Sequence, residues 1–295
     1  MKARRSVVVI GVALVIAVSG VLAERPLQRA AAHVIVTAPN HGKSAPPPLP
    51  GEIRVDVGPP RATLSMTVID ARGGAPRGTV FLLHGIRDRK DSMRAWGEML
   101  ADSGFRAVLV DLRGHGRSTG EFLSYGVVEA RDLAQTLDEL VLRGVVTGPV
   151  GVMGLSYGAA TAIEWAGIDG RVAAVVAIAP FASLRAVAPG YVPVQLPSSF
   201  VNGAVDLAGA TGGFDPDEAS PVGAVTRTRA QVLLIHGNDD ARIPYWHSTL
   251  IAAAGRSHTE LVRVMGAGHN AILSDPDGTI ARRTPAWFRE KLTAH

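Results

Sequence analysis

Short apolar runs alternate with amphipathic stretches from residue 52 to residue 292, and this alternation constrains the fold more than any other feature of the chain. Runs that are apolar at nearly every position are typical of strands buried on both faces, whereas apolar residues three or four positions apart indicate helices. Strands are expected at 52–57, 61–69, 79–83, 107–111, 149–155, 172–179, 231–236 and 261–265. Helices are expected at 91–103, 126–143, 157–167, 246–254 and 279–292. The pattern predicts an α/β fold whose mainly parallel sheet carries helices on both faces.

One stretch interrupts this alternation. Residues 181–229 contain five prolines and are too short to form a domain of their own, so we interpret them as an insertion. Its apolar side chains predict either a wall over a pocket or a surface buried against the body, and the sequence leaves both open. These side chains are Phe181, Leu184, Val187, Tyr191, Val192, Val194, Leu196 and Phe200.

The N-terminal 23 residues have the pattern of an export signal. Basic residues at positions 2–5 precede 18 residues, 6–23, that carry no charge, and Val21-Leu22-Ala23 resembles a cleavage site. The run is long for a signal peptide and short for a membrane span, so residues 1–23 are expected to be a signal peptide or a signal anchor. The charge asymmetry predicts that the rest of the chain lies outside the cytoplasm, anchored in the cell envelope or secreted. A buried core helix is the alternative interpretation.

The next segment, residues 24–51, is rich in alanine and then in proline. Proline fixes the backbone in extended conformations, so we expect a semi-rigid tether, or else an ordinary poorly ordered extension. The folded domain is then expected to span residues 52–295.

The composition excludes several classes of function. The chain has no cysteine, which rules out disulfides, thiolate catalysis and zinc fingers. Its formal net charge is +4, but Lys2, Arg4 and Arg5 belong to the leader, and without them 27 basic residues face 26 acidic ones. Aromatic residues make up only 5%, so no nucleic-acid partner is expected. No metal-binding helix or phosphate-binding loop is present, and the glycine-rich stretch at 114–120 does not match a dinucleotide site, so no cofactor or metal is expected.

The strongest local signal is Gly154-Leu155-Ser156-Tyr157-Gly158. This G-x-S-x-G pattern directly follows one expected strand and directly precedes an expected helix. In such a strand–turn–helix the glycines permit a sharp turn, and the serine hydroxyl projects from the end of the sheet. Ser156 is therefore the candidate nucleophile.

A serine hydroxyl needs a base to take its proton, and the base needs a carboxylate to orient it. His269 directly follows the strand at 261–265 and is the candidate base. Asp239 and Asp240 follow the strand at 231–236, and spacing alone does not separate them. Asp111, at the end of another strand, is a weaker candidate for the acid.

At this point the chain resembles the serine α/β-hydrolases. Six stretches carry the resemblance: LLHGI at 82–86, DLRGHGRS at 111–118, GLSYG at 154–158, APF at 179–181, IHGNDDARIP at 235–244 and GAGH at 266–269. The family pattern HG-x-x-D-x-x-[IV]-P selects Asp240 as the acid. The resemblance also implies an oxyanion hole formed by the backbone N–H groups of Ile86 and Tyr157, whose side chains would be free to vary. The insertion 181–229 falls where the family carries its lid.

The resemblance implies a serine hydrolase that cleaves a carboxylic ester, a thioester or an amide without a cofactor. The most similar subgroup is that of small-lid esterase and peptidase-like hydrolases, which often follow an N-terminal anchor. We expect a small-molecule substrate with an apolar acyl or alkyl group, and contact with a membrane through the N-terminal segment if it is uncleaved. A catalytically silent binding protein and an acyltransferase are the alternatives.

Other polar residues are expected to be structural. His84, His115 and His236 each precede a glycine, and we expect them to shape loops by hydrogen bonding. Glu164 lies in the helix after Ser156, where we expect an exposed helix face; the alternative is a buried partner for a lid residue.

Overall fold

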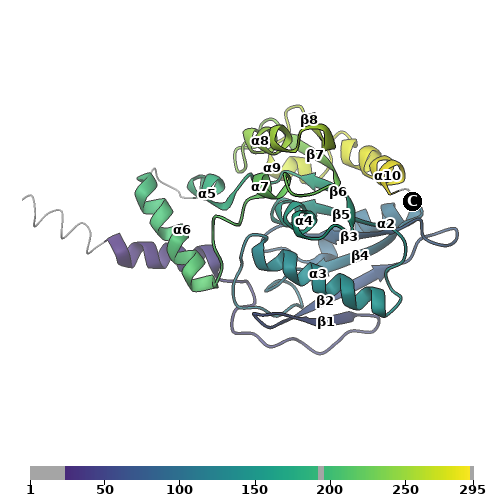
Figure 1. The fold of residues 1–295 in the computed structure, drawn as a ribbon, viewed down its shortest axis with the longest axis horizontal. Helices are drawn as coiled ribbons and strands as arrows, with labels where there is room; N and C mark the ends of the chain where they lie inside the picture. Colours follow the sequence, from purple (N-terminus) through teal and green to yellow (C-terminus); the bar gives the residue numbers. More distant parts are fainter. Residues whose placement is uncertain (1–23, 192–195, 293–295) are drawn as a thin grey trace, which may run out of the picture.

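An eight-stranded sheet forms the centre of the molecule (Figure 1). The computed structural model describes residues 24–191 and 196–292. Along the sheet the strand order is β1-β2-β4-β3-β5-β6-β7-β8. The strands are β1 (Ile53–Val57), β2 (Ala62–Ile69), β3 (Thr79–Leu83), β4 (Arg106–Asp111), β5 (Val150–Leu155), β6 (Val172–Ile178), β7 (Gln231–Gly237) and β8 (Thr259–Val264). Only the β1–β2 and β2–β4 pairs are antiparallel, which confirms the predicted mainly parallel sheet.

Helices cover both faces of the sheet. One apolar core lies between the sheet and helices α3 (Val127–Leu142), α4 (Tyr157–Ile168) and α8 (Trp246–Gly255). The other lies between the sheet and helices α2 (Arg94–Asp102) and α10 (Thr279–Lys291). This two-faced cover confirms the predicted α/β architecture and explains why the parallel strands are apolar on both faces.

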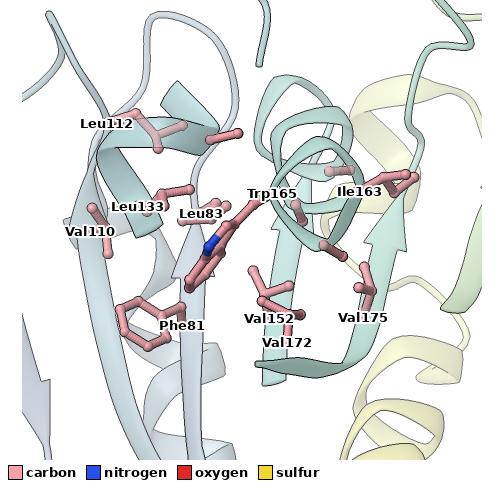
Figure 2. Packing of buried hydrophobic residues seen from close by; sticks show 14 of the residues in the cluster. Phe81, Leu83, Val110, Leu112, Leu133, Val152, Ile163, Trp165, Val172 and Val175 are labelled. Atoms are coloured by element: carbon pink, nitrogen blue, oxygen red, sulfur yellow. The ribbon is translucent and has the colours of Figure 1, made fainter. Parts of the chain in front are cut away.

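Strand β3 shows how the sheet serves both cores. Phe81 and Leu83 point to the α3–α4 side, while Val80 and Leu82 point to the α2–α10 side, as the alternation of side chains along a strand requires. On the first side the Trp165 indole from α4 packs edge to face on Phe81, with ring centroids 5.0 Å apart (Figure 2). Closely packed apolar side chains on both faces of the sheet therefore support the loops at its carboxyl edge.

The segment between β6 and β7, predicted as an insertion, is largely helical. It contains α5 (Leu184–Val187), the 3-10 turn η2 (Ala188–Tyr191), α6 (Ser198–Gly212) and α7 (Pro221–Ala224). Its apolar residues divide between two roles: Leu184 and Val187 are buried, whereas Tyr191 is 52% exposed. Val192 and Val194 lie outside the described residues.

The segment predicted as a tether is instead part of the fold. Residues 24–36 form a helix that lies beside α6 (Figure 1). Ala32 and Val36 are buried in an apolar cluster with α6, and the Gln28 side chain donates to the Phe200 carbonyl at 3.4 Å. The tether prediction is therefore wrong for this part, because apolar residues of the alanine-rich stretch are buried against α6 of the insertion.

The proline-rich part of the same segment also contacts the body. The Asn40 amide donates to the backbone carbonyls of Gly116 and Ser118, both at 2.9 Å. Arg117 in turn donates to the Pro47 carbonyl. Residues 37–50 therefore pack along the surface of the domain and do not form the predicted free-standing tether.

The leader predicted at residues 1–23 lies outside the described residues. Within residues 24–191 and 196–292, none of the helices combines the length and the apolar character needed to cross a bilayer.

Candidate active site

Ser156 sits in a strained turn between β5 and α4. Its backbone angles are φ 52° and ψ −110°, a conformation that costs a non-glycine residue about 1–3 kcal/mol. The flanking glycines, Gly154 and Gly158, have ordinary φ values, so the turn does not depend on their backbone freedom as predicted. They are needed because there is no room for a side chain. A Cβ on Gly154 would lie 2.2 Å from the Gly158 carbonyl oxygen, and one on Gly158 would lie 2.4 Å from the Leu83 carbonyl oxygen. They let the start of helix α4 pack directly against the ends of β3 and β5, while the positive φ is that of Ser156 itself.

His269 approaches Ser156 from the same carboxyl edge of the sheet, at the end of strand β8. It is the first residue of helix α9 (His269–Leu273), in the loop after β8, and it is 7% exposed. Its Nε2 atom lies 3.0 Å from Ser156 Oγ and its Nδ1 atom lies 2.7 Å from Asp240 Oδ2. The three side chains predicted from the sequence therefore form one hydrogen-bonded chain.

Asp240, rather than Asp239, contacts His269. Its Oδ1 atom accepts the backbone N–H groups of Arg242 and Ile243 at 2.9 and 2.8 Å. Burial by itself would raise the pKa of Asp240, but hydrogen bonds from His236, His269 and the Ile243 N–H outweigh it and hold that pKa well below its usual range. Asp239 instead accepts a hydrogen bond from its neighbour Asn238.

These contacts fix the state of the imidazole. A carboxylate can only accept, so His269 Nδ1 must donate to Asp240. In the neutral ring, Nε2 then carries the lone pair and accepts from the Ser156 hydroxyl. This is the tautomer needed to withdraw the serine proton.

The residues predicted for an oxyanion hole lie beside the serine. Tyr157 is the first residue of α4, a position whose N–H has no intrahelical acceptor. Gly85, which precedes Ile86, is so close that a Cβ built on it would be 3.9 Å from Ser156 Cβ. Among the described residues, no backbone carbonyl accepts the N–H of Ile86 or of Tyr157.

The side chain of Tyr157 differs from expectation. The family resemblance implies that this side chain is free to vary, but it is 2% exposed and its hydroxyl donates to Glu129 Oε1 at 2.8 Å. Glu129 is itself fully buried and accepts the N–H groups of Ser124 and Gly126, each at 3.0 Å. The ring therefore ties the start of α4 to the start of α3.

Two other acidic residues have structural positions. Asp111, the weaker candidate for the acid, forms a buried ion pair with Lys90 at 2.7 Å. Glu164 is 4% exposed, so the expectation of an exposed helix face is wrong. It faces Arg227 of the insertion at 3.8 Å, which matches the alternative of a buried partner for a lid residue.

The three histidines expected to shape loops do contact loop carbonyls. His84 bonds the Gly85 oxygen at 2.7 Å, His115 the Arg113 oxygen at 2.9 Å, and His236 the Ile243 oxygen at 2.8 Å. His236 Nε2 also lies 3.3 Å from Asp240 Oδ2, so it supports the acid directly.

Sequence reasoning missed Lys90 and Tyr125. Lys90 is 4% exposed, and its partner Asp111 comes close only because β4 lies next to β3. The Tyr125 hydroxyl donates to the Ile35 carbonyl at 2.8 Å, and its ring lies 5.6 Å from that of Tyr157. No local pattern marks either residue; a signal would have required the strand order and the position of the N-terminal helix.

Comparison with known proteins gives the same fold. An esterase from Pyrococcus furiosus, Pf2001, superposes with a TM-score of 0.67 over 86% of this chain and 98% of its own, at 20% identity. The ferulic-acid-bound Est1E of Butyrivibrio proteoclasticus superposes with a TM-score of 0.60 over 78% of this chain and 96% of its own, at 16% identity. At such identities the likeness shows the fold alone.

Similarity in sequence identifies the family of this chain. The putative protein-lysine deacylase ABHD14B of Rattus norvegicus is 28% identical over 70% of this chain and 80% of its own length. The uncharacterized protein YqkD of Bacillus subtilis is 30% identical, but the match spans only 56% of each chain. The sequence pattern of the alpha/beta hydrolase family matches residues 80–282. This chain therefore belongs to the alpha/beta hydrolase family.

Proposed function

We propose that the protein is a serine hydrolase that cleaves carboxylic esters through an acyl-serine intermediate. The observation that carries this proposal is the unbroken hydrogen-bonded chain from Asp240 through His269 to Ser156. The fold shared with the esterase Pf2001 supports the choice of an ester, although a fold by itself does not determine a reaction.

In the first half of the reaction, Ser156 Oγ bonds to the ester carbonyl carbon while His269 Nε2 takes its proton. Asp240 stabilises the imidazolium that forms. The backbone N–H groups of Ile86 and Tyr157 stabilise the negative oxygen of the tetrahedral intermediate, each by about 3–4 kcal/mol. The imidazolium then gives its proton to the leaving alkoxide, which departs as an alcohol.

In the second half, a water molecule attacks the acyl-serine carbonyl and His269 accepts the water proton. The bond between Ser156 Oγ and the acyl carbon breaks, and the proton returns to the serine oxygen. The products are a carboxylic acid and the free enzyme. Transfer of the acyl group to another acceptor would follow the same steps with that acceptor in place of water.

The surroundings of the serine favour a substrate with an apolar group. Phe181, Val187 and Ile243 are buried in one apolar cluster with Ala160 of α4. The Ala160 N–H donates to the Ser156 carbonyl, and the Ile243 N–H donates to Asp240, so this cluster flanks the triad. We therefore propose a small ester whose acyl or alkyl part is apolar.

A substrate panel tests the proposal. p-Nitrophenyl esters of increasing acyl length are compared with a thioester and with an acyl-lysine peptide, the last because the rat relative is named a lysine deacylase. We expect ester hydrolysis to be fastest, and Ser156→Ala to reduce kcat by about 10⁴–10⁶-fold. Undiminished turnover in Ser156→Ala would refute the serine mechanism, and substrate binding without turnover would indicate a silent binding protein.

We also propose that the domain lies outside the cytoplasm, anchored by residues 1–23 or released after Ala23. The basic residues before the uncharged run 6–23 support this orientation. Cell fractionation and N-terminal sequencing of the mature protein test it. A soluble cytoplasmic protein that still begins at Met1 would contradict export, and a mature chain that begins at Glu24 would contradict the anchor.

A further inference from the structure

The loop that follows β3 carries the proposed oxyanion donor Ile86, and its first residue is the histidine His84. His84 is fully buried. The backbone N–H of Leu112 donates to His84 Nε2 at 3.0 Å, so Nε2 must carry a lone pair. The other nitrogen, Nδ1, lies 2.7 Å from the Gly85 carbonyl oxygen and must donate to it. Two backbone partners therefore leave only one neutral tautomer for this ring, and burial lowers the pKa of His84, which favours that neutral form.

The hydrogen bond from His84 to the Gly85 carbonyl also orients the Ile86 N–H, which belongs to the same peptide unit. In a trans peptide the C=O and the following N–H point in opposite directions. Fixing the Gly85 oxygen therefore fixes the direction of the Ile86 N–H, next to Ser156. The Asp88 N–H donates to the same oxygen at 3.2 Å, and such chained hydrogen bonds polarise one another.

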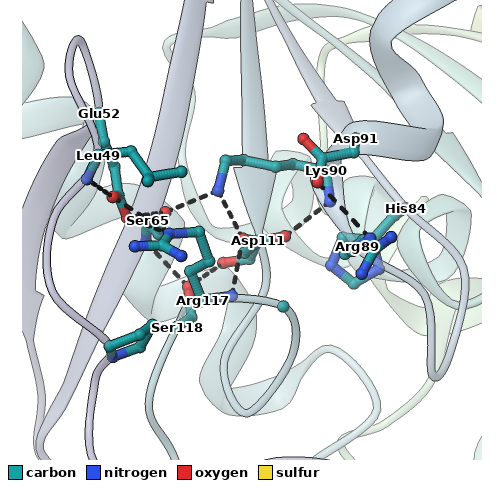
Figure 3. Close-up of polar contacts among 12 residues, drawn as sticks. Leu49, Glu52, Ser65, His84, Arg89, Lys90, Asp91, Asp111, Arg117 and Ser118 are labelled. Carbon is teal, nitrogen blue, oxygen red and sulfur yellow. Dashed lines mark hydrogen bonds and ion pairs between the residues drawn. The ribbon is translucent and has the colours of Figure 1, made fainter.

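The far end of the loop is held by a buried ion pair (Figure 3). The Lys90 N–H donates to Asp111 Oδ1 at 2.6 Å, and the Lys90 ammonium bonds Asp111 Oδ2 and Ser65 Oγ, both at 2.7 Å. Asp111 Oδ2 also accepts the Arg117 N–H at 2.9 Å. A buried lysine is costly unless it is paired in this way.

Adjacent residues at the end of β4 thus hold both ends of the loop: Leu112 through His84, and Asp111 through Lys90. Between these ends Arg87 has a φ of 60°, a strained value for a residue with a side chain. A strained loop keeps its shape only where its surroundings over-determine it.

We propose that His84, Lys90 and Asp111 are positioning residues that clamp the loop 84–90 so that the Ile86 N–H is aimed at the oxyanion. The inference rests on the proposed function. It assigns to the end of β4 a role in transition-state stabilisation, through groups that touch neither substrate nor Ser156. A displacement of about 1 Å at such a donor costs about 10²-fold in rate.

Two variants of His84 separate its two hydrogen bonds. In His84→Asn the side-chain amide replaces Nδ1 and can still donate to the Gly85 carbonyl. In His84→Gln the amide oxygen replaces Nε2 and can still accept from Leu112, but the donor to Gly85 is lost. We expect kcat to fall by about 10²-fold in His84→Gln and by less than about 10-fold in His84→Asn, with KM unchanged in both.

The affinity for an alkyl boronic acid, which forms a tetrahedral adduct on serine, is the second readout. It should weaken by the same factor as kcat/KM, which a merely structural role would not produce. His115→Gln is the matched control, because His115 is also buried in a His-Gly turn, 4.9 Å from the His84 ring, but its Nδ1 bonds the Arg113 carbonyl instead. We expect kcat within about 3-fold of wild type for this control. Wild-type kcat in His84→Gln, or an equal loss in His115→Gln, would overturn the inference.

If the His84 variants do not fold, Lys90→Met provides the second test, because methionine fills a similar volume without the charge. We expect a loss of about 10-fold in kcat and in boronic acid affinity, and unchanged values for both would overturn the clamp. The serine mechanism is tested separately by Ser156→Ala. An active wild type, an inactive Ser156→Ala and unaffected clamp variants would refute this inference alone, whereas an active Ser156→Ala would refute the proposed function as well.

Discussion

Asp240 and Glu164 are equally buried carboxyl groups, but their surroundings differ. Each is 4% exposed. Asp240 is surrounded by four donors, namely two histidines and two backbone N–H groups. Glu164 Oε1 has no hydrogen-bond partner among the described residues, and Arg227 is 3.8 Å from Oε2. The pKa of Asp240 is accordingly held well below its usual range, whereas burial raises the pKa of Glu164 to about 8, with only partial compensation from Ser220 and Arg227.

The difference follows from where the two residues lie in the chain. Asp240 lies in a loop, whose backbone N–H groups at Arg242 and Ile243 are free to turn toward the carboxylate. Glu164 lies inside α4, where the helix uses its own N–H groups for internal bonds. Burial therefore does not by itself determine the charge of a carboxyl group; the supply of donors does, and loops at the ends of strands supply more of them.

The largest expected effect comes from removing the negative charge of Asp240, which removes the difference in charge between Asp240 and Glu164. Asp240→Asn should lower kcat by about 10⁴-fold, because an amide facing His269 Nδ1 favours the wrong imidazole tautomer. Ester hydrolysis measured beside thermal unfolding checks this prediction, since the fold should persist.

Asp239→Asn is the matched control for this substitution, because the two residues are adjacent and only Asp240 contacts His269. We expect a loss of less than about 10-fold for the control. Equal losses, or a larger loss in Asp239→Asn, would contradict the assignment of the acid.

A smaller effect, on stability and not on activity, is expected at Glu164. Its pKa is about 8 in the folded protein against an ordinary value of 4.5, so between these values the folded chain binds more protons than the unfolded chain. Stability then falls as the pH rises from about 4.5 to 8, and the cost is complete above pH 8. Glu164→Gln removes this titration. It should stabilise the protein on the order of 5 kcal/mol at pH 9 and not at pH 4, with kcat unchanged.

Denaturant unfolding at several pH values measures this difference. Glu139→Gln is the control, because Glu139 is a half-exposed helix residue paired with Arg143, and such solvent-accessible pairs contribute little to stability. If Glu164→Gln raises the free energy of unfolding by the same amount at every pH, Glu164 is ionised in the folded protein over the whole pH range. That result would remove the contrast with Asp240.

The strands and most helices could be predicted from the sequence because each is specified locally. Predicted and observed strands agree within a few residues: the run at 79–83 coincides with β3, and the run at 231–236 is one residue shorter than β7. The helices at 24–36 and at α6 were not predicted. Val201, Ala204, Val205 and Ala208 of α6 do have helical spacing, but the helix is stabilised by burial of Val205 in a cluster shared with Val36 of the N-terminal helix, which no local pattern shows.

The proposed triad could be named in advance because each member follows a strand directly, so that topology brings the three together at one edge of the sheet. The choice between Asp239 and Asp240 came from the resemblance to a family, and the geometry now shows which of them meets His269. The sequence left two alternatives for Glu164, an exposed helix face and a buried partner for a lid residue, and could not settle the choice between them, because the choice depends on how α7 packs on α4. Contacts of that kind join segments that are far apart in sequence and leave no local pattern.

Labelling with a fluorophosphonate tests the central claim most directly, because only an activated serine reacts with it at an appreciable rate. Mass spectrometry of the labelled wild-type protein should find one adduct, on the peptide that contains Ser156. Ser156→Ala should show no adduct, and His269→Ala should react at least about 10³-fold more slowly. An adduct on another residue, or wild-type labelling in His269→Ala, would contradict the account.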